Sequence, residues 1–270
     1  MLTAVRVPET LSDAITVLST DPNALLIGGG TTTVPTLNRG TPTTVAVSLR
    51  RLKDGLTGVG VDGEVVTLGA LTPLAALERE PRLAFLHAAL AAVGSPTLRS
   101  TATVGGNFFV EEPYGDVACA LIALGATGTV AGPDGEEIVA AESLAADSLP
   151  RGHILTSLAF RLPAAGTWRF RKAARRALDS ASIVTVAAVV VEDGGVVASA
   201  RVALSGATRR PKCSPATEAA LIGRALDHAT AEAAGRAALA DAEPFDDEYA
   251  SAWYRARVLP VHVRRALIGA

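Results

Sequence analysis

Residues 101–107, Thr-Ala-Thr-Val-Gly-Gly-Asn, are the stretch around which the fold of this chain is predicted to form. The stretch begins in residues that favour strands and breaks on two glycines, and a helical apolar run begins at Asp116. Because glycine has no Cβ, paired glycines can leave backbone N–H groups open to a bulky anion. Residues 27–33, Ile-Gly-Gly-Gly-Thr-Thr-Thr, have the same chemistry and add three hydroxyl groups. Two such segments predict a nucleotide that is held by its phosphates.

Each of these features also has a simpler interpretation when it is taken alone. Residues 28–30 have the composition of a flexible turn, without the G-x-G-x-x-G pattern of dinucleotide sites or the lysine of a P-loop. Asp116 can hydrogen-bond a ribose or ribitol hydroxyl, or cap the helix that follows it, and it can do both. The two glycine segments in one chain favour anion binding.

Composition excludes several classes of function. The chain has 270 residues, 49% of them hydrophobic, so it can bury the cores of two domains. Its net charge of −2 provides no general basic surface for nucleic acid. The longest strongly apolar segment, residues 183–191, is far shorter than the ~18 residues that a membrane helix needs. With no signal-peptide pattern at its start, the chain is predicted to be cytoplasmic.

Neither metal binding nor nucleophilic catalysis is indicated. Cys119 and Cys213 are the only cysteines, too few for a four-cysteine iron–sulfur cluster, and the four histidines lack metal-ligand spacing. No G-x-S-x-G elbow occurs, and Cys119 is expected to be a small buried hydrophobe. Glu111 and Glu112 are expected to lie in a solvated turn. We therefore predict no catalytic side chain and no metal ligand, so that any redox metal must belong to another chain.

The pattern along the chain predicts an α+β protein of two domains. The first domain is expected to span residues 1–165 and to contain two subdomains. Of these, residues 1–55 form a small β-α-β-like unit and residues 56–165 a mostly antiparallel sheet with helices on one face. The boundary is predicted at residues 163–166, Pro-Ala-Ala-Gly, and residues 166–270 form the second domain.

Local signals predict individual elements within these domains. Thr72 and Ser214, each followed by proline, are expected to cap helices. Asp-Gly at residues 62–63 predicts a hairpin. A helix is expected over residues 82–93. Strands are expected over residues 24–27, 44–49, 98–104, 128–139 (as a hairpin), 154–162, 168–174, 182–191 and 196–204.

Arg169, Arg171 and Lys172 give the first strand of the second domain a basic character. Because side chains alternate along a strand, Arg169 and Arg171 should share one face and Lys172 should lie on the other. The residues either form a local cationic site or line an edge strand whose charges discourage aggregation. Periodicity alone favours neither interpretation.

The quoted segments together closely resemble the FAD-binding medium subunit of the xanthine dehydrogenase and carbon monoxide dehydrogenase family of molybdenum hydroxylases. The resemblance rests on residues 27–35, on residues 103–107, and on Pro-Tyr-Gly-Asp at residues 113–116. It covers essentially the whole chain in the right order. Further agreement lies in residues 69–72, 94–99, 175–179, 254–255 and 263–267.

The resemblance implies a FAD-binding domain of the PCMH or vanillyl-alcohol-oxidase type, followed by a C-terminal domain with a small antiparallel sheet and helices. Its two subdomains enclose FAD, with both glycine segments at the pyrophosphate and Asp116 at a flavin hydroxyl. No histidine precedes His87, so the FAD is expected to be non-covalent. The implied cofactor-binding residues are Ile27, Gly28, Gly29, Gly30, Thr31, Thr32, Thr33, Val93, Thr103, Val104, Gly105, Gly106, Asn107, Asp116, Leu155, Arg171 and Lys172.

By the same resemblance, the chain is a FAD-dependent oxidoreductase subunit. It passes electrons from iron–sulfur clusters of a partner chain through FAD to NAD⁺, oxygen or another acceptor. The implied partners are a large molybdopterin subunit and a small subunit with 2Fe-2S clusters, in a heterotrimer or its dimer.

Two alternatives remain. A stand-alone PCMH-type flavin oxidase or reductase needs a catalytic side chain over the flavin, and only Tyr114 lies near the quoted segments. A scaffold subunit that has lost its flavin is the other alternative, and the intact glycine segments argue against it.

Overall fold

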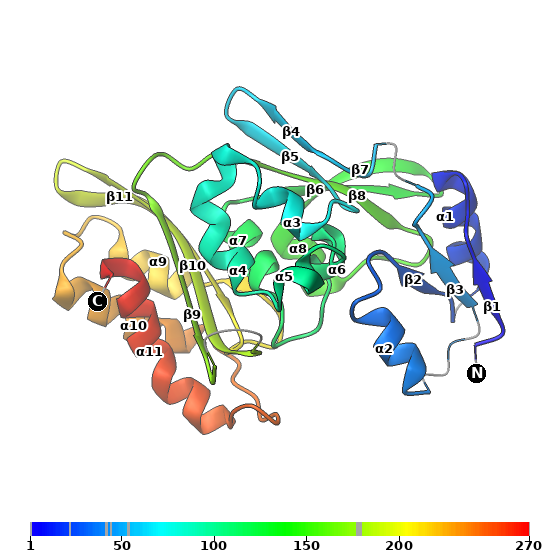
Figure 1. The fold of residues 1–270 in the computed structure, drawn as a ribbon. Coiled ribbons are helices and arrows are strands. Elements are labelled where there is room, and N and C mark those ends of the chain that lie inside the picture. The colour runs from blue at the N-terminus through cyan, green and yellow to red at the C-terminus, as the bar shows by residue number, and fades with distance from the viewer. Residues whose placement is uncertain are drawn as a thin grey trace.

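The computed structural model describes residues 2–21, 23–40, 43, 45–52, 55–176 and 180–269. The described strands form three sheets, which follow one another along the molecule. The N-terminus and the C-terminal helix lie at opposite ends (Figure 1). The predicted α+β class is confirmed.

The N-terminal unit is a small parallel sheet in the order β1-β3-β2. Its elements are β1 (Ala4–Arg6), α1 (Leu11–Thr20), β2 (Leu25–Ile27), α2 (Thr33–Asn38) and β3 (Val45–Ser48). Helix α1 buries Ala14 and Leu18, which share one face of the predicted helix. The β-α-β-like prediction is therefore confirmed. Thr44, which belongs to the strand predicted over residues 44–49, lies outside the described residues.

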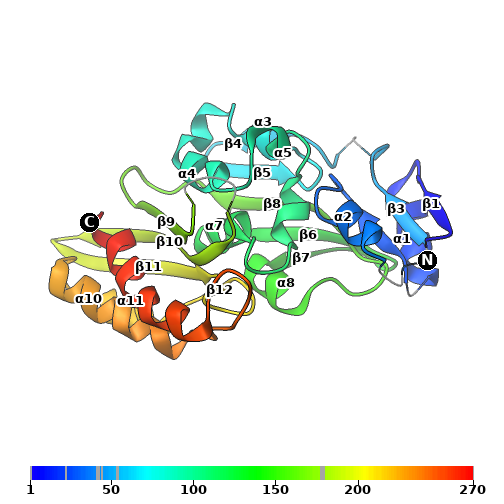
Figure 2. The ribbon, with the colours of Figure 1, turned by 60° about the horizontal axis from the view of Figure 1, so that its bottom comes forward.

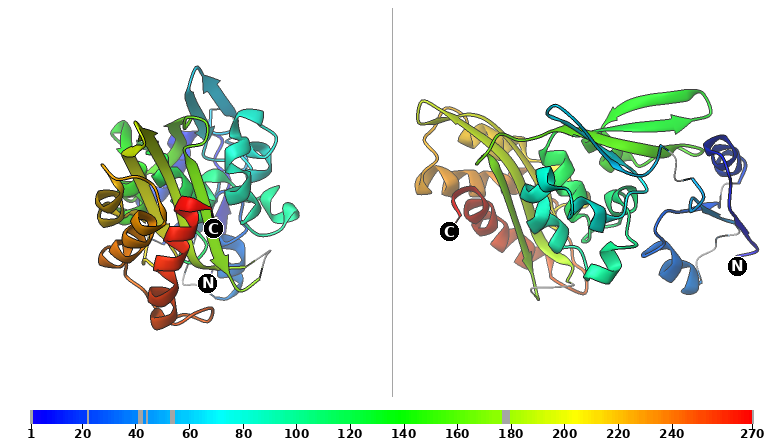
Figure 3. Two further views of the ribbon diagram at one scale, coloured as in Figure 1. Left: turned by 90° about the vertical axis from the view of Figure 1, so that its left-hand side faces the viewer. Right: turned by 45° about the horizontal axis from the view of Figure 1, so that its top comes forward.

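The second unit is a five-stranded antiparallel sheet in the order β4-β5-β8-β6-β7. Its strands are β4 (Val59–Asp62), β5 (Val65–Gly69), β6 (Thr127–Gly132), β7 (Gly135–Ala140) and β8 (Ile154–Arg161). Its helices are α3 (Leu74–Leu77), η1 (Pro81–Leu86), α4 (His87–Ala91), α5 (Pro96–Arg99), α6 (Val104–Phe108), α7 (Asp116–Ala123) and α8 (Ala141–Asp147). Both predicted hairpins are present, and the helices cover one face of the sheet (Figure 3).

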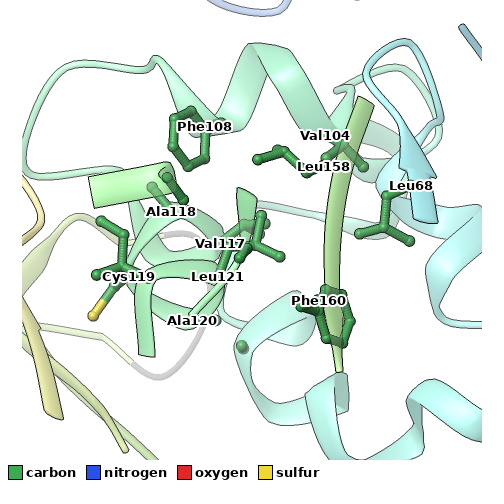
Figure 4. Packing of buried hydrophobic residues seen from close by; sticks show 14 of the residues in the cluster. Leu68, Val104, Phe108, Val117, Ala118, Cys119, Ala120, Leu121, Leu158 and Phe160 are labelled. Atoms are coloured by element: carbon green, nitrogen blue, oxygen red, sulfur yellow. The ribbon is translucent and has the colours of Figure 1, made fainter. Parts of the chain in front are cut away.

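Helix α7 is the centre of the largest hydrophobic core. Every residue of α7 is buried, which explains why its sequence is apolar on all sides. Figure 4 shows Val117 and Leu121 among residues of the five-stranded sheet, with Phe108 above them. Cys119 lies on the other side of the helix, where its sulfur is 3.4 Å from the carbonyl oxygen of Ala203. As predicted, this cysteine is a buried, free thiol.

The C-terminal unit is a four-stranded antiparallel sheet in the order β12-β11-β10-β9. One face packs on α7 and the other on the C-terminal helices (Figure 2). No helix in the described part of the chain is long and apolar enough to cross a membrane. The elements are β9 (Trp168–Ala174), β10 (Ser182–Asp193), β11 (Val196–Ser205), β12 (Lys212–Cys213), α9 (Pro215–Leu221), α10 (His228–Ala237), η2 (Ala238–Ala240) and α11 (Ala252–Ile268).

The predicted strand before the glycine pair, and the predicted break of the chain at the pair itself, are both wrong. Residues 98–104 do not form a strand: they belong to α5, to a turn and to the start of α6, so that Gly105 and Gly106 lie inside a short helix. The hydroxyl of Thr103 accepts a hydrogen bond from the N–H of Gly106 and caps this helix. Such a capping hydrogen bond stabilises the first turn of a helix, so residues with strand propensity can still begin a helix.

The other helix predictions are also corrected. The helix expected over residues 82–93 is divided into the 3₁₀ turn η1 and the short α4. Thr72 does not cap α3, because its hydroxyl exchanges two hydrogen bonds with the backbone of Gly58. Ser214 occupies the cap position of α9, but its hydroxyl donates to the carboxylate of Asp241 at 2.8 Å.

Helices α10 and α11 pack so closely that Gly235 admits no side chain. A Cβ at Gly235 would lie 2.3 Å from the carbonyl oxygen of Pro260. We expect Gly235→Ala to lower the free energy of unfolding by about 1–3 kcal/mol, because the helices must separate. Ala229→Ser, on an exposed position of α10, is the matched control. Equal urea-unfolding midpoints for the two variants would contradict this packing argument.

Candidate functional site

The two glycine segments lie against each other. A Cβ at Gly29 would stand 2.0 Å from the carbonyl oxygen of Thr101, and one at Gly28 would stand 3.1 Å from Oγ1 of Thr103. Only glycine allows the first segment to approach the second this closely. Segments 70 residues apart in sequence are thus brought to one place, as a shared nucleotide site requires.

The N–H groups of the second segment already have partners. Val104 donates to the carbonyl of Thr72 at 2.9 Å, and Gly105 donates to that of Ala70 at 2.8 Å. Gly106 donates to the Thr103 hydroxyl at 3.1 Å. The expectation that these glycines leave their N–H groups open is therefore wrong. Their lack of a side chain instead lets α6 lie close to residue 70, since a Cβ at Gly105 would be 3.1 Å from the Ala70 oxygen.

The first segment supplies the backbone donors. In the part of the chain that the structure describes, the N–H groups of residues 28–32 make no hydrogen bond. Gly30 has φ +76°, a conformation that favours glycine, and turns the chain into α2. The hydroxyl of Thr33 points back to the Leu26 carbonyl at 3.5 Å. Successive free N–H groups before a helix form a concave surface suited to an anion.

Asp116 is the most highly connected buried acid of the chain. It is the first residue of α7 and does not cap it, so the capping interpretation is wrong. One carboxylate oxygen, Oδ2, accepts from Nζ of Lys172 at 2.6 Å, and the other, Oδ1, accepts from the hydroxyls of Ser182 at 2.9 Å and Thr185 at 2.8 Å. Burial raises the pKa of Asp116, and the Lys172 charge opposes this rise.

The basic strand β9 separates its side chains as the alternation predicts. Lys172 faces α7 and also donates to the carbonyl of Ala92 at 2.9 Å. On the other face, Arg169 bonds the Leu267 carbonyl of α11, and Nε of Arg171 lies 3.4 Å from Nδ1 of His262. β9 is also the edge strand of its sheet. Lys172 thus fits the interpretation as part of a local cationic site, and the arginines on the other face fit the interpretation as charges of an edge strand.

A cavity of about 540 Å³ opens between α4 and β9, next to Lys172. Four of its lining side chains are basic, and most of the others are small. Such a cavity favours an anionic or strongly polar ligand. Residues 177–179, which belong to segment 175–179 of the family resemblance, lie outside the described residues. The lining residues are Ala88, Ala91, Ala92, Phe170, Arg171, Lys172, Ala174, Arg175, Arg176 and Ser180.

Val93 and Leu155 are buried in the largest core and line none of the three main cavities, so their contact with a flavin stays a prediction. The turn that carries Val93 is held firmly. Arg99, itself buried, donates to the carbonyls of Val93 and Gly94, both at 3.1 Å, and pairs with Glu78 at 2.7 Å. Lys172 and Arg99 together bind three consecutive carbonyls at the end of α4.

Glu112 does not lie in a solvated turn as predicted, although its neighbour Glu111 is exposed. The Glu112 carboxylate accepts from the Ser205 hydroxyl at 2.8 Å and from the N–H of Gly206 at 2.9 Å. Burial raises its pKa to about 7, against these hydrogen bonds, and the charge of Asp116 adds to the rise.

Sequence reasoning missed Ser182, Thr185, Arg99 and Glu112. Two hydroxyl residues inside an otherwise aliphatic strand were the one local signal for Ser182 and Thr185, because an unpaired hydroxyl in a core is costly. Among the described residues, no group of three His, Cys, Asp or Glu could hold a metal ion.

The pH dependence of stability provides a test of the Glu112 site. The pKa of Glu112 is about 7 in the folded chain and 4.5 in the unfolded chain. Between these two pH values, the folded chain therefore holds a proton that the unfolded chain has lost. Stability must therefore fall as pH rises through this window, by at most ~3 kcal/mol. We expect Glu112→Gln, which keeps an accepting oxygen but cannot titrate, to lose this part of the slope in urea unfolding from about pH 4 to about pH 8. Glu111→Gln should keep the wild-type slope, and an unchanged slope in Glu112→Gln would contradict the burial of this carboxyl.

Comparisons with family models and with known proteins cover nearly the whole chain. The family described as FAD binding domain in molybdopterin dehydrogenase matches residues 3–164, and the family described as CO dehydrogenase flavoprotein C-terminal domain matches residues 168–270. The carbon monoxide dehydrogenase medium chain of Afipia carboxidovorans is 27% identical, over 96% of this chain and 93% of the relative. The nicotine 6-hydroxylase medium subunit of Paenarthrobacter nicotinovorans is 28% identical, over 97% and 95%.

Solved structures are similar over the same length. A chain of carbon monoxide dehydrogenase from Hydrogenophaga pseudoflava superposes with a TM-score of 0.93 and 26% identity, covering 99% of this chain and 96% of that one. A chain of quinoline 2-oxidoreductase from Pseudomonas putida 86 gives a TM-score of 0.90 and 26% identity, covering 100% and 97%. The chain therefore belongs to the FAD-binding flavoprotein family of the molybdopterin dehydrogenases, the molybdenum hydroxylase family that its sequence resembles.

Proposed function

We propose that this chain is the medium, FAD-carrying subunit of a multi-subunit molybdenum hydroxylase. In this role it passes electrons from iron–sulfur clusters of a partner chain through FAD to a final acceptor. The observation that carries the proposal is the contact between the two glycine segments, which holds the free backbone donors of residues 28–32 against the second segment. Full-length similarity to medium chains supports it.

The residues present fit FAD. The free N–H groups of residues 28–32 suit its pyrophosphate, and Gly29 keeps them against the second segment. Asp116 and Lys172 suit the hydroxyl and carbonyl groups of the flavin end. When bound, FAD supplies reversible one- and two-electron redox chemistry, while the protein binds and orients it. Without a histidine before His87, non-covalent binding is expected.

The division of the chain follows the same proposal. Residues 1–165 are the FAD-binding domain, of two subdomains, and residues 166–270 are its C-terminal domain. The limits of the two family matches, at residues 164 and 168, support this boundary.

Partner subunits must hold the metals. Both cysteines are buried and free, and the described residues contain no group suited to a metal ion. A large molybdopterin subunit and a small iron–sulfur subunit, in a heterotrimer or its dimer, account for this division of labour. The names of related chains, which are medium chains of larger dehydrogenases, support the assignment.

Among NAD⁺, oxygen and other acceptors, the cavity favours one that carries negative charge, such as NAD⁺. Four basic side chains line it beside Lys172. Tyr114 does not support the alternative of a stand-alone flavin oxidase. Its hydroxyl is hydrogen-bonded to the Tyr249 hydroxyl at 2.5 Å, and Tyr114 lines none of the three main cavities.

FAD binding provides the first test. We expect the purified chain to bind one FAD, seen by its visible flavin absorption, and to release it on denaturation. We expect Gly106→Val to bind FAD at least tenfold more weakly and to remain folded. A Cβ at Gly106 would lie 2.9 Å from the Thr103 hydroxyl, the same atom that Gly28 approaches, so the valine crowds the point where the segments meet. Gly60→Val, in an exposed hairpin, is the control. A wild-type chain that takes up no added FAD would refute the proposal.

The electron-transfer role is tested in the complex. Co-expression with a molybdopterin subunit and an iron–sulfur subunit encoded beside this chain should yield a complex whose FAD is reduced by the substrate of the large subunit. The FAD-loaded chain alone should remain oxidised with that substrate. Reduction of the isolated chain by the substrate would favour the stand-alone flavoenzyme.

A further inference from the structure

The C-terminal unit supplies every side-chain donor to the Asp116 carboxylate that the described residues contain. Asp116 lies at the start of α7, in the FAD-binding domain, and α7 packs on β10 and β11. Lys172 comes from β9, and Ser182 and Thr185 come from β10, where both are fully buried. A carboxylate that is held across a domain boundary by three donors is a built arrangement, since each group alone is costly to bury.

The hydrogen-bonding capacity of the carboxylate is unevenly used. A carboxylate has about four acceptor positions, two on each oxygen. Both positions of Oδ1 are taken by the Ser182 and Thr185 hydroxyls, whereas Oδ2 accepts only from Lys172. The Lys172 ammonium has three protons and uses two, for Asp116 and for the carbonyl of Ala92. One acceptor and one donor therefore remain, on adjacent atoms.

These two remaining positions are near the basic cavity. Lys172 and Ala92 both line it, whereas Asp116 lies behind Lys172, with Oδ2 2.6 Å from the Lys172 ammonium. The Ser182 and Thr185 hydroxyls bind the oxygen that faces β10, and they lie 2.9 Å from each other. Two fixed hydroxyls on one oxygen prevent the carboxylate from rotating, which would exchange Oδ1 for Oδ2.

We propose that Ser182 and Thr185 are positioning residues of the flavin site: they orient the Asp116 carboxylate so that Oδ2 and the Lys172 ammonium together receive a hydroxyl and an adjacent acceptor group of the cofactor. This inference rests on the proposed binding of FAD. The C-terminal domain would thus contribute to cofactor binding indirectly, because these two hydroxyls contact Asp116 and need not contact the cofactor.

The first test is isosteric removal of one hydroxyl. Thr185→Val should weaken FAD binding about tenfold or more, because a hydrogen bond to a buried charge is lost and the carboxylate is freed to rotate. Thr185→Ser, which keeps the hydroxyl, should bind like the wild type, and Ser182→Ala should resemble Thr185→Val. The matched control is Thr208→Val, another fully buried threonine of the same unit whose hydroxyl bonds only the Leu204 carbonyl. The measurement is the FAD dissociation constant from quenching of flavin fluorescence.

A pH profile separates positioning from a general loss of stability. The charged and titratable groups that face Asp116 are Lys172 of β9, Glu112 before α7, and Cys119 within α7. Both hydroxyls lower the pKa of Asp116, so their removal raises it. The loss of FAD affinity on acidification should then begin at higher pH in Thr185→Val and Ser182→Ala than in the wild type and in Thr208→Val.

The outcomes are distinct. Wild-type affinity and an unshifted profile in both folded hydroxyl variants would overturn the positioning role while leaving FAD binding intact. Equal weakening in Thr208→Val would also overturn it, as a purely structural effect. A wild-type chain without FAD affinity would refute the proposed function itself. If Thr185→Val does not fold, Ser182→Ala and its rescue by Ser182→Thr decide the question by the same criteria.

Discussion

The burial of the Asp116 carboxylate is the constraint on which the rest of this structure depends. A charge removed from water costs several kcal/mol unless donors surround it, and its donors here lie on another sheet. The four-stranded sheet must therefore dock on α7 with its first two strands in register for the charge to be satisfied. Domain packing and cofactor geometry become a single requirement, which explains why a polar residue begins a helix that is otherwise wholly apolar.

Close backbone approach is the second constraint, and the glycines serve it in different ways. Gly29 brings two distant segments into contact, whereas Gly105 lets a short helix lie against the end of a strand. The donors that face a ligand come from the first segment, and the second segment forms the wall against which they are held. Where the two segments meet, backbone N–H groups are thus free in the first segment and hydrogen-bonded in the second.

Periodic and glycine-rich patterns were sufficient to predict the sheets, the hairpins and the place where the two segments meet. They failed where a distant partner decides the local structure. Glu112 is half-buried, and the Ser205 hydroxyl and the Gly206 N–H bind its carboxylate from 93 and 94 residues away. The Ser182 and Thr185 hydroxyls stand out in an aliphatic strand, but their partner could not be predicted because it lies on another domain. The missed cap of α6 is different, since the partner of Thr103 is only three residues away.

Arg255 makes the start of β10 depend on the C-terminal helix α11. Its guanidinium is fully buried and donates to the carbonyls of Ser182, Ile183 and Gly206, while Asp247 neutralises it at 2.6 Å. The start of β10, with its hydroxyls, is therefore anchored by a residue of the last helix. The N-terminal domain is synthesised first. The hydroxyl donors to its Asp116 carboxylate lie on β10, and the start of β10 is bound by Arg255 of α11, which is synthesised last. A chain that lacked α11 would therefore lose the anchor that holds the start of β10, and with it the Ser182 hydroxyl, against α7.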